Sequence, residues 1–254
     1  MSWAARRRFI ILFIIGAVAV AFIAILGIAT LTEAPSCKDR TQNQGEIGID
    51  CGGPCPYLCP TQAHAPTVLF TKAIPNGVGR TDVVASVENV NADAAAKNVP
   101  YKITLYGAGQ VFVQEVMGTL DLPPLSKVAV FIPGISSGSQ KTIRAFLTIE
   151  PGSFEWYTLD TTGQVRPVVV NTKLGGATST PRVDATLSNA GVMALTNVPV
   201  IVLVQDERGE VIAASQTIVS VIPAQGQATA TFTWNSAFPS TPARIEVSPV
   251  TTLP

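Results

Sequence analysis

The chain has 254 residues, of which 47% are hydrophobic and 13% are charged, and its formal net charge is zero. After Arg8, fourteen basic residues face seventeen acidic ones. This balance excludes the strongly basic surface that a nucleic-acid binder needs to neutralise phosphates, and the high apolar content argues against a disordered chain.

The first predicted element is a membrane-spanning helix from Phe9 to Leu31. The stretch has no charged residue, and at about 1.5 Å per residue it reaches the roughly 30 Å of a hydrocarbon core. Arg6, Arg7 and Arg8 precede it, so the positive-inside rule places residues 1–8 in the cytoplasm and the remainder outside the plasma membrane. A cleaved secretory signal is the alternative, but its apolar region usually has about 7–15 residues. We therefore expect an uncleaved signal-anchor.

A cysteine-rich module follows at residues 32–65. It holds all four cysteines of the chain, which are Cys37, Cys51, Cys55 and Cys59. In an exported protein, an even number of clustered cysteines favours disulfides, because so short a segment cannot bury enough apolar surface to fold without them. We expect two disulfides, with three connectivities open.

Three other roles for this module stay open. Four thiolates could hold a structural zinc ion, although only the last three cysteines have the usual spacing of zinc ligands. Cys51 and Cys55 could carry out thiol–disulfide chemistry, although three residues rather than two separate them. Oxygen ligands of the kind that calcium uses are also present, and their alternative role is to form turns; they are Asp39, Asn43, Glu46 and Asp50.

At these residues the chain resembles a short cysteine motif that recurs in exported bacterial proteins, beside a membrane anchor or an adhesive domain. The matching run is Cys-x-Asp-x-x-x-Asn-x-x-Glu-x-x-x-Asp-Cys-Gly-Gly-Pro-Cys, from Cys37 to Cys55. Arg40 stands where the motif most often has a glycine. The resemblance implies a surface module and names no ligand.

The rest of the chain repeats itself at an offset of about one hundred residues, which indicates two copies of one domain, at 66–150 and 166–254. Matching segments are Asp82–Asn89 with Asp184–Asn189, and Asn98-Val99-Pro100 with Asn197-Val198-Pro199.

Both copies have the sequence pattern of an antiparallel β-sandwich. Short runs rich in Val, Ile and Thr alternate with Gly, Pro and Asn about every 8–12 residues. Ala228, Ala230 and Phe232 alternate with threonines, so one face of that strand should pack inward. The stretch from Val198 to Val204 is nearly all apolar, which predicts a central strand with both faces buried.

Each copy also resembles immunoglobulin-like domains of the FxLYD and CARDB type, which occur on bacterial and archaeal cell surfaces. The first copy keeps Leu105-Tyr106 of the FxLYD signature, and the second keeps its aspartate as Asp206. The resemblance implies β-sandwiches used for spacing, adhesion or protein contact rather than for chemistry. As a whole, the chain is similar to single-span bacterial envelope proteins.

Between the copies, residues 151–165 carry an aromatic cluster in a chain with only 7% aromatic residues. An exposed pair of Trp156 and Tyr157 could be a contact for a partner protein. The alternative, which we favour, is that Phe154 and Trp156 complete an edge strand or lie as a wedge between the sandwiches.

No catalytic motif is recognisable in the sequence, which has a single histidine, His64, and lacks a nucleophile elbow, a zinc-binding helix motif and a phosphate loop. We therefore predict a mainly β, non-enzymatic, membrane-anchored envelope protein that presents two Ig-like domains for adhesion, scaffolding or assembly. Its expected partners are the membrane and another envelope or surface protein, with no nucleic acid, no small-molecule substrate and no cofactor beyond the calcium or zinc considered above. The alternatives are an accessory subunit of a secretion, pilus or sensor complex, and an extracytoplasmic thiol–disulfide protein.

Overall fold

The computed structural model describes residues 3–31, 36–77, 79–136, 141–160 and 165–253. Residues 32–35, where the expected cysteine-rich module begins, and residues 161–164 of the expected aromatic linker lie outside the described residues. The chain divides into two compact units, Met1–Pro56 and Tyr57–Pro254.

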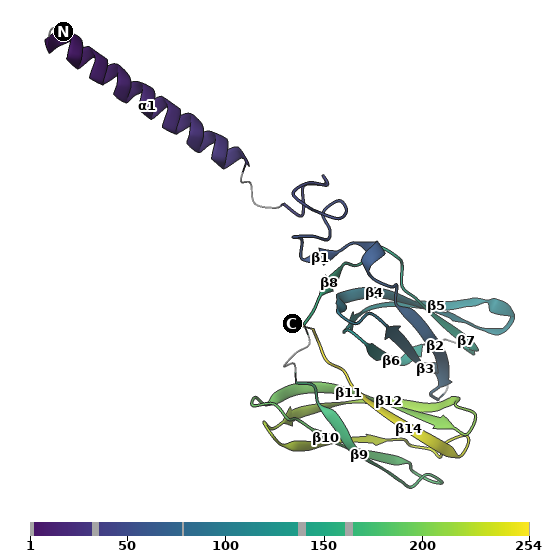
Figure 1. The fold of residues 1–254 in the computed structure, drawn as a ribbon. Helices are drawn as coiled ribbons and strands as arrows, with labels where there is room; N and C mark the ends of the chain where they lie inside the picture. The colour runs from purple at the N-terminus through teal and green to yellow at the C-terminus, as the bar shows by residue number, and fades with distance from the viewer. Residues whose placement is uncertain (1–2, 32–35, 78, 137–140, 161–164, 254) are drawn as a thin grey trace. The chain divides into compact units, whose positions relative to one another are not determined.

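The first unit begins with the helix α1 (Trp3–Leu31) (Figure 1). Within it, Arg6–Ile28 is long and apolar enough to cross a membrane, and no part of its most apolar window is buried inside the protein. A helix suits lipid because every interior backbone N–H and C=O is paired within the segment. The N-terminal apolar helix is thus confirmed, as a membrane anchor or a signal sequence.

The rest of the first unit is a loop closed by a disulfide. Cys37 and Cys55 are bonded with their Cα atoms 5.7 Å apart. Cys51 of this unit is disulfide-bonded as well, and so is Cys59, which belongs to the second unit. Gly53 has a φ of 60°, and a Cβ at this position would lie 2.2 Å from the carbonyl oxygen of Gly45. Only glycine fits there without moving the loop. The expected pair of disulfides is confirmed.

The second unit is built from antiparallel β-sheets, as predicted. In its first half, β2 (Thr67–Pro75), β3 (Arg80–Asn89) and β6 (Ser126–Ser136) form one sheet in the order β2-β3-β6. The second sheet has the order β1-β8-β4-β5, with β7 also paired to β4; its strands are β1 (Tyr57–Leu58), β4 (Ala94–Tyr106), β5 (Phe112–Leu122), β7 (Arg144–Thr148) and β8 (Trp156–Thr158). Two 3₁₀ turns, η1 (Pro60–Gln62) and η2 (Ala108–Gln110), connect strands. Buried side chains of both sheets, such as Val83 and Ile103, form one core.

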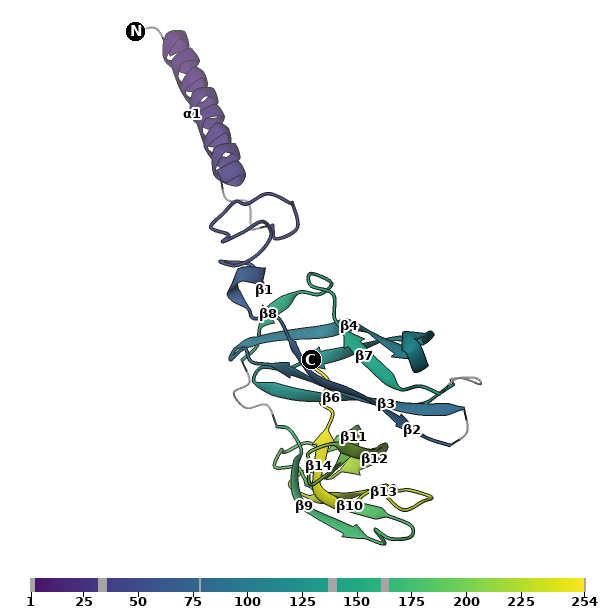
Figure 2. The ribbon, with the colours of Figure 1, turned by 90° about the vertical axis from the view of Figure 1, so that its right-hand side faces the viewer.

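The second half also has two antiparallel sheets, each of three strands, drawn as stacked layers in Figure 2. The strands β9 (Val168–Gly175), β10 (Arg182–Ser188) and β13 (Gln227–Thr233) pair in the order β13-β10-β9. The strands β11 (Leu195–Asp206), β12 (Val211–Ile222) and β14 (Pro242–Pro249) pair in the order β12-β11-β14. Ala230 and Phe232 are buried while Thr229 and Thr233 are exposed, so the predicted alternation along this strand is confirmed.

The central strand β11 is buried on both faces, as its apolar sequence predicts. Val200, Val202 and Val204 point into the core of the second half. Ile201 and Leu203 point the other way and pack with Val84 in a separate buried cluster. The two halves of the second unit therefore share an apolar contact surface.

The two Asn-Val-Pro tripeptides lie within the strands β4 and β11. In β4 the register with β5 shifts between Ala96 and Val99, and Asn98 has a φ of 52°. Asn197 in β11 has a φ of 51°. Asparagine tolerates this left-handed conformation better than other residues with a side chain, so the tripeptide marks an irregularity in the strand.

Candidate functional site

The carboxylates of the cysteine-rich loop accept hydrogen bonds from the loop's own N–H groups. The Asp50 carboxylate accepts from the backbone N–H of Asp39 at 3.0 Å and of Arg40 at 3.0 Å. The Glu46 side chain, which is 7% exposed, accepts from the backbone N–H of Asp50 at 3.2 Å and of Asn43 at 3.4 Å. The structure thus gives these side chains a turn-forming role.

Asp39 is held by side chains as well as by the backbone. Its carboxylate accepts from the Thr41 hydroxyl at 2.6 Å, from the Thr41 N–H at 2.9 Å and from the Asn43 side-chain amide at 2.9 Å. These donors lower the pKa of Asp39 below its ordinary value, and the Thr41 hydroxyl has the largest effect. Calcium binding by this loop stays a prediction.

Zinc does not fit the bonded state of the cysteines. The ligand atoms of Cys37, Glu46 and Cys55 lie within 4.8 Å of one another, but the two sulfurs are joined in a disulfide. Zinc binds thiolates, and no cysteine of the chain is free. Zinc binding by these cysteines therefore stays a prediction that needs at least one of the disulfides to be reduced, and thiol–disulfide chemistry stays a prediction as well.

The aromatic segment is structural at Trp156. Trp156 is 7% exposed, stacks edge-on with Phe154 at a centroid distance of 5.3 Å, and pairs with Ala96 of β4 and Leu58 of β1. A buried indole cannot be a surface contact, which corrects that interpretation. Because β1 covers its far side, β8 is also not an edge strand.

Tyr157 is half-buried, and its hydroxyl is enclosed without a hydrogen-bond partner among the described residues. Burial, together with the negative charge of Asp121, raises the pKa of Tyr157 above its ordinary value.

Arg6, Arg7 and Arg8, which set the predicted topology, are exposed on α1. The Arg7 guanidinium lies 4.0 Å from the centre of the Trp3 ring.

A groove that sequence reasoning missed lies along β12. It has a volume of about 1130 Å³, and its walls are β12, the loop after β13, and the turn between β2 and β3 with part of β6. Trp234 and Phe238 form an edge-to-face pair at 5.1 Å on one side of it. The groove is assembled from distant segments, so no local pattern could reveal it. The one visible signal was the absence of charge from Val211 to Ile222.

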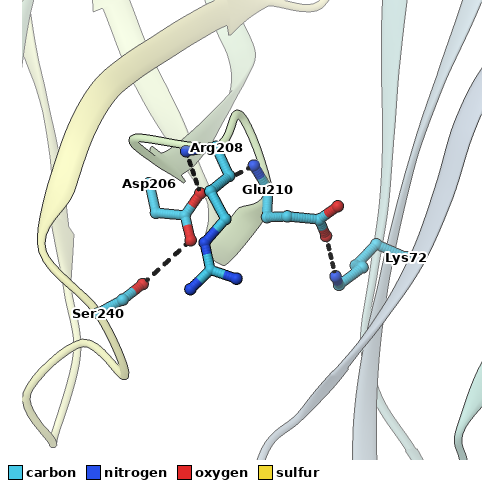
Figure 3. A network of polar contacts seen from close by, with 5 residues as sticks. All are labelled: Lys72, Asp206, Arg208, Glu210 and Ser240. Carbon is cyan, nitrogen blue, oxygen red and sulfur yellow. Dashed lines mark hydrogen bonds and ion pairs between the residues drawn. The ribbon is translucent and has the colours of Figure 1, made fainter.

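A polar network holds the beginning of β12 in place (Figure 3). The Asp206 carboxylate accepts from the backbone N–H of Arg208 at 2.9 Å and of Glu210 at 3.0 Å, and Gly209 takes a φ of 77° in the same turn. Glu210 forms an ion pair with Lys72 of β2. Both side chains are largely exposed, so the pair adds little stability, and the turn itself sets the position of β12.

Comparisons with known proteins give no family for this chain. No family model matches it, and no curated protein matches it. Among solved structures, a red sea bream transglutaminase has 12% identity and a TM-score of 0.21, over 74% of this chain and 31% of that one. A β-glucuronidase from glycoside hydrolase family 2 has 11% identity and a TM-score of 0.22, over 82% of this chain and 26% of that one. The chain thus spans a third or less of either protein, and likenesses at these TM-scores carry no inference.

Proposed function

We propose that this protein is a membrane-anchored, non-enzymatic scaffold that presents two β-sandwiches outside the plasma membrane for adhesion or protein assembly. The observation that carries the proposal is the helix at Arg6–Ile28, which is apolar throughout its central part and unburied. A helix of this length with no protein packed around it is best satisfied by lipid. The disulfides agree with an oxidising compartment beyond the membrane.

We further propose that the two sandwiches are copies of one Ig-like domain. Their strands pair in corresponding orders. Asn89 and Asn189 occupy equivalent positions and donate to the carbonyls of Pro123 and Pro223 at 2.8 Å and 3.1 Å. Domains of this class serve mainly as display and contact modules, which supports a scaffold over an enzyme.

A second candidate is an accessory subunit of a secretion, pilus or sensor complex that binds one protein partner. The groove beside β12 favours it, because a groove next to a sheet edge is a common site for binding an extended peptide.

Orientation in the membrane tests the scaffold proposal. The full chain is expressed in a bacterium, and intact spheroplasts are treated with a protease. We expect the chain to stay with the membranes after alkaline extraction and the β-sandwiches to be digested from outside. Because Arg6, Arg7 and Arg8 set the orientation, replacing all three by glutamate should reduce the fraction of chains whose β-sandwiches the external protease digests. Lys141→Glu should leave this fraction unchanged. Recovery of the chain in the soluble fraction would sink the proposal.

A further inference from the structure

The strand β12 is an edge strand without the usual protection. Among the residues that the structure describes, the sheet order β12-β11-β14 leaves one side of it unpaired. From Val211 to Ile222 it contains no charged residue, no proline and no glycine. Edge strands of natural proteins are normally protected by such residues. The corresponding edge strand β5 carries the charged residues Glu115 and Asp121, so of these two edges only the one at β12 lacks protection by charge.

The register of β11 with β12 shows which backbone groups point outward. Pro199 lies opposite Ile218, and because proline has no N–H, this cannot be a pair that exchanges two hydrogen bonds. Hydrogen-bonded and non-hydrogen-bonded pairs alternate along an antiparallel ladder, so every second residue belongs to the same class as Ile218. Gln216, which lies opposite Ile201, is such a residue, and its backbone N–H and C=O also point away from β11. The N–H and C=O groups of Gln216 and Ile218 therefore point to the free edge.

Trp234 supports this assignment. Its indole N–H donates to the carbonyl oxygen of Ala214 at 3.4 Å, and Ala214 belongs to the same alternating set, opposite Leu203. The indole thus covers one outward carbonyl of the edge. The next two residues of the set, Gln216 and Ile218, line the groove.

The groove offers a ligand backbone bonds and neutral side chains. Among the described residues that line it, the only charged one is Asp82. The Asp82 carboxylate already accepts from the Asn76 side-chain amide at 3.0 Å and from the Gly134 N–H at 2.6 Å. A charged ligand group would lose its hydration here without gaining a partner of opposite charge.

We propose that this groove binds an extended, uncharged peptide segment of a partner protein, which adds to the edge of β12 as a further strand. Its backbone would pair with Gln216 and Ile218, and its side chains would lie between Trp234 with Phe238 and the wall formed by Pro75 and Phe131. We favour a single added strand over the β12 of a second copy, because a second copy would bring its own sheet and loops into the groove. This inference deepens the second candidate function, a subunit that binds one protein partner, and rests on it.

The test uses the full chain in lipid nanodiscs and a phage-displayed library of random heptapeptides. We expect the selection to enrich peptides poor in charged residues, and Gln216→Pro to weaken binding of the selected peptides at least tenfold. The Gln216 N–H points away from β11, so proline removes the contact to the ligand without breaking the ladder. Met117→Pro is the matched control, because Met117 lies two residues before the partner of Pro100 on β5, as Gln216 does for Pro199 on β12.

Hydrogen exchange with the tightest peptide gives a second measurement. Binding should slow exchange of the Gln216 and Ile218 amides and leave those of Ser215 and Thr217, which face β11, unchanged. The inference is overturned if no peptide is enriched over empty nanodiscs, if Gln216→Pro binds as well as the parent, or if Gln216→Pro instead abolishes a dimer of the chain. Since orientation is measured separately in spheroplasts, these outcomes leave the anchoring proposal intact.

Discussion

The Asn89 side chain joins distant segments of the first sandwich. It is 1% exposed, and its amide donates to the carbonyls of Ala94 and Pro123 at 2.8 Å each. Its oxygen accepts from the Asn91 N–H at 3.0 Å. Buried polar groups need such partners, so the side chain fixes the loop after β3 against the loop before β6.

We expect Asn89→Asp to lower the free energy of unfolding by about 1–3 kcal/mol, because a carboxylate cannot donate and leaves buried carbonyls unpaired. Asn189→Asp should do the same in the second sandwich. Urea unfolding followed by tryptophan fluorescence in a Trp3→Phe background measures both, since Trp156 and Trp234 report on different sandwiches. Asn98→Gly is the control, because glycine tolerates its positive φ. Wild-type stability in Asn89→Asp would contradict the assigned role.

Asp39 gives the cysteine-rich loop a dependence on pH. Its pKa is lowered in the folded loop, and the largest cause is the hydrogen bond from the Thr41 hydroxyl. The contribution of Asp39 to stability is therefore present above the unfolded pKa and is lost as the pH falls through the folded pKa. In an NMR titration of the full chain in nanodiscs, we expect its midpoint below that of an unstructured aspartate. Thr41→Val should raise the midpoint, and an unchanged value would contradict the assigned hydrogen bond.

At the scale of elements, β11 joins two apolar clusters through alternate side chains. Val202 faces the core of the second sandwich and Ile201 faces the cluster that contains Val84. Successive side chains of β11 thus pack against different surfaces, one in the core of the second sandwich and the next in the cluster shared with the first sandwich.

We expect Val202→Asp to abolish cooperative unfolding of the second sandwich, because a carboxylate would be buried without a partner. Ile201→Asp should leave that sandwich folded and lower its unfolding temperature, since only the contact with the first sandwich is lost. Thermal unfolding followed by Trp234 fluorescence distinguishes the two, with the exposed Thr229→Asp as control. Equal effects of Ile201→Asp and Val202→Asp would refute the two-sided assignment.

The sequence predicted those features that depend on local patterns. Alternation from Ala228 to Thr233 and the apolar stretch from Val198 to Val204 reflect which faces are buried. The pairing of Trp156 with both β1 and β4 and the groove along β12 depend on contacts between segments far apart in the chain. No periodicity records such contacts, so the sequence favoured a structural role for Trp156 without showing that β8 pairs on both sides.

For the whole molecule, the central claim is an uncleaved, membrane-anchored chain whose cysteines are oxidised outside. The most direct test is the intact mass of the protein extracted from bacterial membranes, recorded with thiol alkylation before and after reduction. We predict the mass of the full chain less four hydrogens, with no alkylation until reductant is added. The account would be contradicted by the mass of a shorter chain that begins after the apolar helix, or by alkylation of all four thiols before reduction.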